Sequence, residues 1–548
     1  MGLAACLEEG PPVTQAEPTL DTLVVAIPTD ATHLLSPLAT SSFEASVLDL
    51  IGARPLDADF SCELKFEAEL AKSWQWSTDG LELDLLLRSD FRWEDGTPVT
   101  ASDLALAAAL ANDPEVASPR ADAHSRLDPK ARPEVVHAHH VRYRFLERGN
   151  QASMVASVAL LQVVPNHLLG LQGMNRSVLR SHPLNTTAPL SSGRWKVASW
   201  EKGRSLVLEP NPEYPGPAPG LRKVVFNVVP DYAARLAAIE GGTADLMEGV
   251  QVADADALLT KAPGMRLVRR GYRAVDYIGW NQVEPPDEAK TAGPVPHRLF
   301  GDLRVRSALT AAIDVDRLIA ESLTSAATGE VYAKRSVGTI TPELCALQSV
   351  VQPIPFGTGE AKRGLAEAGW SDSNGDGVVD REGVDFRFSL LMPAGSPRRE
   401  VAAGLILAQL REVGVDARLE VIDPAALVQR LLAHDFDAVY TGWSSGLQAD
   451  SQRAWAAGSD LNFTSFADPE AERLLQAATA EPDTAKANEL WSAFEARVYS
   501  QQPYTFLFWV DEIVAVHGRF EGAGTDLISP WHDLAAWKVP ADRVRYLE

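Results

Sequence analysis

The sequence predicts an α/β fold, and three observations lead to this prediction. Residues 386–442 alternate strand and helix patterns in the order β-α-β-α-β, which forms a mostly parallel sheet with right-handed crossovers. Near the amino terminus, a strand pattern at residues 81–88 leads into a capped helix. The composition, 46% hydrophobic and 23% charged, is that of a globular protein with a large core. At about 150 residues per domain, 548 residues predict three or four domains, or fewer if they are large.

The first elements follow from local patterns. An apolar run at residues 23–28 ends in proline and predicts a buried strand. Residues 81–88 alternate before they become apolar, as in a strand with one solvated face. Thr100 and Asp103 form a capping signature for a helix over residues 101–111.

The middle of the chain continues this organisation. Strand patterns occur at residues 205–209 and 223–229. Asp231 can cap a helix that ends at Glu240. Apolar side chains at helical spacing predict an amphipathic helix over residues 305–313.

The β-α-β-α-β series also predicts where a ligand binds. Its expected elements are a strand at 386–391, a helix at 399–413, a strand at 415–422, a helix at 425–432 and a strand at 436–441. Ligands of open α/β sheets lie beyond the carboxyl ends of the strands. We therefore expect a binding site near residues 393–396 and 443–446.

The net charge excludes several partners. The chain carries 50 Lys+Arg and 74 Asp+Glu, which gives −24 at pH 7. Without a basic block, it lacks the cationic clusters that bind nucleic acid or an anionic membrane surface. No stretch reaches the roughly 18 apolar residues of a transmembrane helix. We expect no nucleic-acid partner and no membrane span.

The first residues predict a lipid anchor. Residues 3–6 read Leu-Ala-Ala-Cys, which resembles the lipobox of a bacterial lipoprotein signal peptide, although the charged and apolar parts that precede a lipobox are missing. A chance match is the alternative. If the lipobox is real, Cys6 carries the lipid, residues 1–19 are a lipoprotein tether, and the protein works outside the cytoplasm.

The two other cysteines, Cys62 and Cys345, leave two possibilities. They could form one disulfide in an oxidising compartment. We expect two separate buried thiols instead, because the sequence gives no distance between them. No Cys-x-x-Cys motif occurs, so a redox motif or a zinc ribbon is not predicted.

Five short segments together carry a family resemblance. They are Leu70-Ala71-Lys72-Ser73-Trp74, Trp93-Glu94-Asp95-Gly96-Thr97-Pro98, Glu209-Pro210-Asn211-Pro212-Glu213-Tyr214, Val305-Arg306-Ser307-Ala308-Leu309 and Ala366-Glu367-Ala368-Gly369-Trp370. In this order they resemble the extracytoplasmic solute-binding proteins of the oligopeptide, dipeptide and nickel ABC-importer family, solute-binding family 5. The resemblance covers about residues 20–520.

The resemblance implies a two-lobed periplasmic-binding-protein-like fold with mixed sheets, an inserted subdomain and a hinge. The implied parts are lobe I at 20–55, 186–275 and 500–548, the inserted subdomain at 56–185 and lobe II at 276–499. Such a protein is not an enzyme. It captures a peptide-like or related organic solute between closing lobes and delivers it to an ABC permease. We expect a monomer without a cofactor, lipid-anchored in the periplasm or at the cell surface, and an ATPase on another subunit, because no Walker A motif occurs.

The resemblance also places ligand-binding residues on two strands. Trp280 and Asn281 match a strand that crosses between the lobes and faces the cleft. Core packing is the alternative for Trp280, since tryptophan is mostly buried in any protein.

The second strand carries Trp443, Ser444, Ser445 and Gly446. Peptide-binding members have an Asp three residues after the Trp, which pairs with the peptide amino terminus, and here that position is Gly446. A buried ammonium group without its carboxylate is costly, so a non-peptide solute is the alternative to a standard peptide. Asp450 could substitute if its loop bends back.

Residues 442–446 also match the Gly-x-Ser-x-Gly nucleophile elbow of serine hydrolases. Ser444 would then need a histidine, His517 or His532, and an acid such as Asp511. No oxyanion-hole segment is evident, so catalysis is the less favoured interpretation.

A metal is possible at one loop. Asp372, Asn374, Asp376 and Asp380 supply side-chain oxygens and Val378 a carbonyl, at the spacing of a Ca²⁺ loop. The twelfth place is Gly rather than the Glu of an EF-hand, so a solvated turn held by Asx hydrogen bonds is the favoured alternative to structural calcium. His137, His139 and His140 form a second candidate, for which we expect an ordinary polar hairpin.

Overall fold

The structure, a computed structural model, describes most of the chain. The described residues are 22–119, 126–128, 132–170, 176–285, 295–347, 351–446, 449, 452–524, 527, 529–531, 533–540 and 543. Cys6 with the predicted tether, Asp450 and His532 lie outside them.

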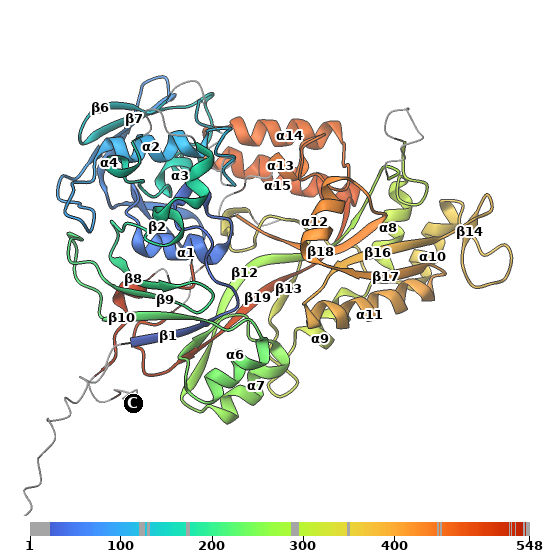
Figure 1. Ribbon diagram of the computed structural model, residues 1–548. Coiled ribbons are helices and arrows are strands. Elements are labelled where there is room, and N and C mark those ends of the chain that lie inside the picture. Colours follow the sequence, from blue (N-terminus) through green and yellow to red (C-terminus); the bar gives the residue numbers. More distant parts are fainter. Residues whose placement is uncertain are drawn as a thin grey trace, which may run out of the picture.

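An 11-stranded mixed sheet runs through the molecule in the order β17-β16-β18-β12-β19-β11-β1-β10-β9-β8, with β13 also paired to β19. Two long antiparallel strands occupy its middle, β12 (Met265–Trp280) and β19 (Tyr504–His517). Figure 1 shows them side by side between the two halves of the molecule. The sheet is therefore continuous across both halves, and the chain crosses between them on these strands.

One half, which we call the β1 unit, is built on the β1 end of the sheet. Thr22–Ile27 (β1) pairs in parallel with β10 and β11. Apolar side chains of both faces are buried under helices, as a central strand requires. The elements of the unit are β8 (Trp195–Glu201), β9 (Ser205–Pro210), β10 (Lys223–Val228), β11 (Leu246–Met247), α1 (Ser42–Ile51), α6 (Tyr232–Glu240) and α7 (Val252–Lys261).

The other half, the β18 unit, contains the predicted β-α-β-α-β series. β16 (Arg387–Pro393) pairs in parallel with β17 (Asp416–Ile422) and β18 (Ala438–Ser444), which confirms the prediction. Its remaining elements are α8 (Leu303–Ala311), α9 (Val315–Ser322), α10 (Thr358–Glu367), α11 (Pro397–Glu412), α12 (Pro424–Leu432), α13 (Gln452–Trp455), α14 (Pro469–Ala480), α15 (Thr484–Gln501), β13 (Ala333–Arg335) and the hairpin β14 (Asp380–Arg381) and β15 (Val384–Asp385).

A third unit, the inserted unit, lies between α1 and β8 in the chain and has its own core. Its elements are β2 (Leu56–Phe60), β3 (Leu64–Ala68), β4 (Ala71–Trp76), β5 (Glu82–Leu87), β6 (Glu134–His137), β7 (His140–Arg144), α2 (Ala101–Ala111), α3 (Gln151–Ala159), α4 (Asn166–Leu169) and α5 (Pro183–Thr186). The lobe boundaries given above stay a prediction.

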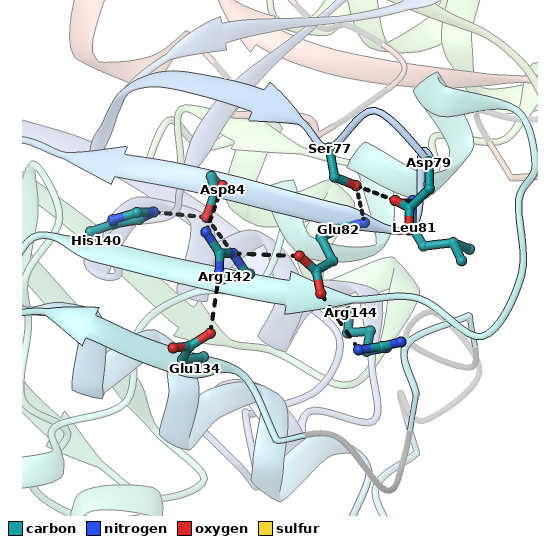
Figure 2. A network of polar contacts seen from close by, with 9 residues as sticks. All are labelled: Ser77, Asp79, Leu81, Glu82, Asp84, Glu134, His140, Arg142 and Arg144. Atoms are coloured by element: carbon teal, nitrogen blue, oxygen red, sulfur yellow. Dashed lines mark hydrogen bonds and ion pairs between the residues drawn. The ribbon is translucent and has the colours of Figure 1, made fainter.

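Charged side chains of alternating sign cover one face of the inserted unit's four-stranded sheet (Figure 2). Asp84 accepts hydrogen bonds from Arg142 Nε at 2.9 Å and from His140 Nε2 at 2.8 Å. Burial alone would raise the pKa of Asp84, but these bonds outweigh it and lower the pKa. The three histidines do not lie on one strand, because a turn separates His137 from His140, and in the described part of the chain no group of residues is arranged to hold a metal ion.

Helix α2 begins where the sequence predicts. The Asp103 carboxylate accepts hydrogen bonds from the backbone N–H of Thr100 at 2.7 Å and of Asn166 at 2.9 Å. We expect Asp103→Ala to lower the free energy of unfolding by about 1–2 kcal/mol, the usual cost of a lost helix cap. Urea denaturation measures this, and Asp113→Ala, just past the end of the same helix, is the control. A loss no larger than that of the control contradicts the capping role.

The structure contradicts the expectation that Cys62 and Cys345 are separate thiols. Cys62 and Cys345 form a disulfide with a Cα–Cα distance of 4.9 Å, and both residues are exposed. The expectation of two buried thiols is wrong because the two cysteines, in a turn and at the start of a short 3-10 helix, are 283 residues apart, and the sequence carries no signal that they are neighbours. Among the described helices, none is both long and apolar enough to cross a bilayer.

Candidate functional site

The candidate site lies at the carboxyl end of β18, the edge where α/β sheets bind ligands. Trp443 is half-buried there, and Ser444 and Gly446 are exposed. Ser445 is buried, and its backbone N–H donates to the carbonyl of Arg273 at 2.7 Å. Four residues predicted to contact a solute therefore lie together at this edge. Contact with a solute itself stays a prediction.

Aromatic rings surround Trp443. Its ring stacks on Phe463, with centroids 5.3 Å apart, and lies parallel to Tyr277 at 6.4 Å. Tyr277 in turn stacks on Tyr504 at 4.0 Å, and Trp443 Nε1 donates to the Tyr504 hydroxyl at 3.4 Å. Flat apolar surfaces with few fixed polar groups are typical of sites for organic solutes. The half-buried Trp443 offers such a surface at the rim of this stack.

A charged cluster lies on the crossing strand β12, on the opposite face of the sheet from these rings. Asp276 is fully buried and accepts hydrogen bonds from two consecutive arginines at the start of α11: Arg399 Nη2 is 2.8 Å from Oδ1, and Arg398 Nη2 is 3.2 Å from the same atom. The Tyr440 hydroxyl donates to Oδ2 at 3.3 Å. Burial alone would raise the pKa of Asp276, but the two guanidinium groups outweigh it and lower the pKa to about 2. The carboxylate is therefore ionised at neutral pH.

Gly442 contacts the charged cluster only, because successive side chains of a strand point to opposite faces and the Trp443 ring lies on the other face with Tyr277. It precedes Trp443, and a Cβ at this position would lie 2.7 Å from Arg399 Nη2 and 2.7 Å from Asp276 Oδ1. Real Cβ atoms do not approach that closely. The glycine thus lets the ion cluster pack directly against the strand that carries Trp443.

Trp280 and Asn281 lie elsewhere. Both are fully buried. Trp280 Nε1 donates to Thr505 Oγ1 at 3.0 Å, and the ring packs on Phe300 with centroids 5.0 Å apart. The Asn281 amide donates to the Phe436 carbonyl at 3.0 Å. The Trp280 side chain is therefore packed in the core, as the alternative interpretation holds. In this structure neither residue lies at the exposed end of β18.

The residues of the hydrolase interpretation are not brought together. Ser444 pairs with Ala274 of β12, whereas His517 pairs with Met265, nine positions away on the same strand. At about 3.3 Å per residue, roughly 30 Å separates the serine from this histidine. Asp511 instead pairs with Arg269 Nε at 2.8 Å. A triad of Ser444, His517 and Asp511 is therefore excluded by the geometry.

The predicted calcium loop is an exposed turn between α10 and β14. Asp372 accepts hydrogen bonds from the N–H groups of Gly375 and Gly377, at 2.7 and 3.0 Å, and Asp380 accepts one from Ser373 N at 2.8 Å. These are the bonds of the Asx-turn alternative.

Because its oxygens are engaged within the loop, and no cluster of metal-binding side chains is found in the residues that the structure describes, we expect calorimetry at millimolar Ca²⁺ to show no binding heat. A saturable heat that Asp376→Ala abolishes would contradict this expectation. It would establish the calcium site, which stays a proposal and would consist of Asp372, Asn374, Asp376, Val378 and Asp380.

The sequence reasoning did not find the cluster of Asp276, Arg398 and Arg399, although it placed the loop before α11 at the ligand edge. A signal was present. Asp276 is a carboxylate inside an apolar strand, and a buried charge requires a partner of opposite sign. The two arginines that follow the strand-end loop are candidates for that partner.

The chain is similar to known solute-binding proteins. Residues 65–465 match the family of bacterial extracellular solute-binding proteins, family 5 Middle. The oligopeptide-binding protein AppA of Bacillus subtilis is 25% identical over 468 residues, covering 84% of this chain and 81% of AppA. The solved structure of AppA in complex with a nonapeptide superposes with a TM-score of 0.79 at 23% identity, over 96% of this chain and 100% of that one. NikZ from Campylobacter jejuni, in complex with Ni(L-His), superposes with a TM-score of 0.78 at 19% identity, over 95% and 99%.

Proposed function

Because this chain belongs to the bacterial extracellular solute-binding proteins of family 5, we propose that it is the substrate-binding component of an ABC importer. It captures a peptide-like or related organic solute between two closing lobes and passes it to a permease. The edge of β18 carries this proposal, since the half-buried Trp443 and the rings stacked around it lie there, at the ligand edge of the sheet. No catalytic triad is needed for such a function, and the described residues do not bring together the one considered above.

The substrate class rests on two considerations. AppA is named for oligopeptide binding, which makes a peptide the default. The site of this chain, however, has Gly446 in place of the carboxylate that would pair with a peptide amino terminus. We therefore propose a solute whose recognition does not depend on a free ammonium group, and a non-peptide solute is the second candidate.

A thermal-shift screen tests the proposal. Peptides with a free amino terminus, the same peptides N-acetylated, and a panel of non-peptide organic solutes are compared. We expect at least one set to raise the melting temperature by several degrees, because a ligand that binds only the folded state stabilises it. Equal shifts for free and acetylated peptides support the role of Gly446. If only the non-peptide solutes stabilise the protein, the proposal that it binds a peptide is wrong.

The anchor is proposed separately. Cys6 would carry a lipid that holds the protein on the outer face of a bacterial membrane, where it acts as a monomer next to its permease and ATPase subunits. Expression in a bacterial host with a radiolabelled fatty acid, with the charged and apolar parts of a lipoprotein signal peptide placed before residue 3, tests this. Label that is lost in Cys6→Ser is the expected result, and an unlabelled parent chain contradicts it.

A further inference from the structure

The disulfide joins two different units of the molecule. Cys62 lies in the turn between β2 and β3 of the inserted unit. Cys345 begins the short 3-10 helix η4 (Cys345–Leu347), which follows β13 in the β18 unit. The two residues are 283 positions apart in the chain, and their units have separate hydrophobic cores. The bond is therefore a covalent link between two bodies.

The segment that carries Cys345 is fixed to the β18 unit. The Glu495 carboxylate of α15 accepts hydrogen bonds from the backbone N–H groups of Thr339 and Ile340, each at 3.4 Å. Thr339 Oγ1 accepts a hydrogen bond from Trp455 Nε1 of α13 at 3.2 Å. Ile340 packs against the core to which α14 and α15 contribute. A force on Cys345 is therefore transmitted to α15 and the helices around it.

The inserted unit is fixed to the β1 unit by α1 and the residues before it. Leu35 and Leu38 precede α1 in the chain and are buried in the core of the inserted unit. Between them, Ser36 Oγ donates to Gln162 Oε1 at 2.7 Å, and Gln162 Nε2 donates to Asp49 of α1 at 2.5 Å. Apolar side chains of α1 lie in the core of the β1 unit. Because these contacts are buried on both sides, the two units form one body.

The strands β12 and β19 connect this body to the β18 unit. β12 pairs with β19 over residues 265–270 and again from Ala274, where its pairing with β18 also begins. The register shifts between Arg270 and Ala274. A strand bends where regular pairing is interrupted, and hinges use a few residues that absorb such a change. We expect the hinge at residues 271–273.

Polar contacts accompany the disulfide where the inserted unit meets the β18 unit. Asn150, the cap of α3, donates to Thr484 Oγ1 in the first turn of α15 at 3.1 Å. Arg126 donates to the Thr479 carbonyl at 3.5 Å, and a Cβ at Gly149 would lie 3.1 Å from the same oxygen. Figure 1 shows α14 and α15 beside the inserted unit, while β12 and β19 connect the halves elsewhere. Hydrogen bonds of this kind exchange for bonds to water at small net cost when two units part, whereas the disulfide does not break.

We infer that the Cys62–Cys345 disulfide is a covalent clasp that limits how far the β18 unit separates from the other two units. Opening about the hinge would carry the inserted unit, together with the β1 unit, away from α14 and α15. The disulfide keeps the two Cα atoms 4.9 Å apart. The oxidised protein therefore opens only as far as the turn between β2 and β3 and the segment before η4 bend, and reduction removes this limit.

The clasp can be opened chemically as well as by mutation, because both cysteines are exposed. Dithiothreitol supplies the two electrons and two protons that convert the disulfide into two thiols, and it becomes a cyclic disulfide itself. This route leaves the sequence at both positions unchanged.

Electron–electron double resonance on the solute-free protein tests the clasp directly. Nitroxide labels are attached to exposed positions in a Cys6→Ser background, through Val136→Cys on β6 of the inserted unit and Val428→Cys on α12 of the β18 unit. We expect Cys62→Ser/Cys345→Ser to broaden the distribution of distances between the labels and to raise its mean by more than about 2 Å, the scale of a domain rearrangement.

A second label pair is the control. It joins Val136→Cys to Ala237→Cys, an exposed position on α6 of the β1 unit. Its distances should be the same with and without the disulfide, because the inserted unit and the β1 unit form one body. If this pair changes as much as the first pair, the inserted unit itself has come loose, and the clasp between the halves is overturned.

Small-angle X-ray scattering supplies a measurement that needs no substitution at the disulfide. A compact chain of this length has a radius of gyration of about 24 Å, and we expect dithiothreitol to increase it by on the order of 1 Å in the solute-free protein. Asn150→Ala without dithiothreitol should leave the radius unchanged, because the covalent bond remains.

Two results would overturn the clasp. One is identical label distances and identical scattering with and without the disulfide. The other is a thiol titration that finds two free thiols in the native Cys6→Ser protein, since the bond would then be absent. No solute is present in any of these measurements, so their outcome is independent of the proposed function.

Discussion

Asp276→Asn is expected to lower the free energy of unfolding by about 3–5 kcal/mol, the cost of removing one partner from a buried ion pair. The substitution leaves Arg398 and Arg399 facing a neutral amide in place of the carboxylate. Asp460→Asn is the matched control. It removes an exposed carboxylate from its arginine, Arg453, and should cost at most about 1 kcal/mol. Urea denaturation at pH 7 measures both losses, and equal losses contradict a special role for Asp276.

The same variant has a predicted pH signature. The pKa of Asp276 is lowered from 3.8 to about 2 in the folded protein, by two guanidinium groups that outweigh its burial. A lowered pKa means that the unfolded chain takes up the proton first. The stabilisation is therefore complete above about pH 4 and is lost as the pH falls through 2. We expect the stability difference between parent and Asp276→Asn to shrink over this interval, and a constant difference would refute the ionised cluster.

Trp443→Ala is expected to weaken solute binding by about 30-fold, or roughly 2 kcal/mol, the usual loss when an aromatic residue that contacts the partner is truncated. Removing the ring takes away the face that stacks on Phe463 and Tyr277 at the rim of the site. Trp443→Phe keeps an aromatic face and should recover most of the affinity. Calorimetry with the compound that gives the largest thermal shift measures the change.

Trp74→Ala is the control for this experiment, because Trp74 is a half-exposed tryptophan of the inserted unit. It should bind like the parent. If Trp443→Ala also binds like the parent, Trp443 does not contact the solute, and the proposed position of the site is wrong.

Local sequence patterns predict the elements whose causes are local. The strands and helices of residues 386–442 follow from apolar periodicity, and α2 from its cap, so the structure agrees with them to within a few residues. The length and course of β12 could not be predicted from local sequence patterns. The strand is 16 residues long and rich in arginine, because one part of it pairs in each half of the molecule and its charged side chains meet partners more than 100 positions away.

Long-range proximity explains the remaining differences. The disulfide joins a turn and a short 3-10 helix whose sequences carry no signal of each other. Asp276 meets its arginines only when β12 lies beside β18 and α11 packs over them. The family resemblance supplied the two-lobed fold, and it directed attention to Trp443. It could not identify Asp276, Arg398 and Arg399, because none of them belongs to the segments that carry the resemblance.

Native mass spectrometry of the purified protein tests the central claim most directly, because a binding protein with closed lobes retains its solute. We expect a discrete mass excess over the polypeptide that disappears on denaturation, and its accurate mass and fragmentation identify the solute. The bare polypeptide mass, unchanged after incubation with the peptide and organic-solute panels, would contradict the proposal that this chain captures a solute.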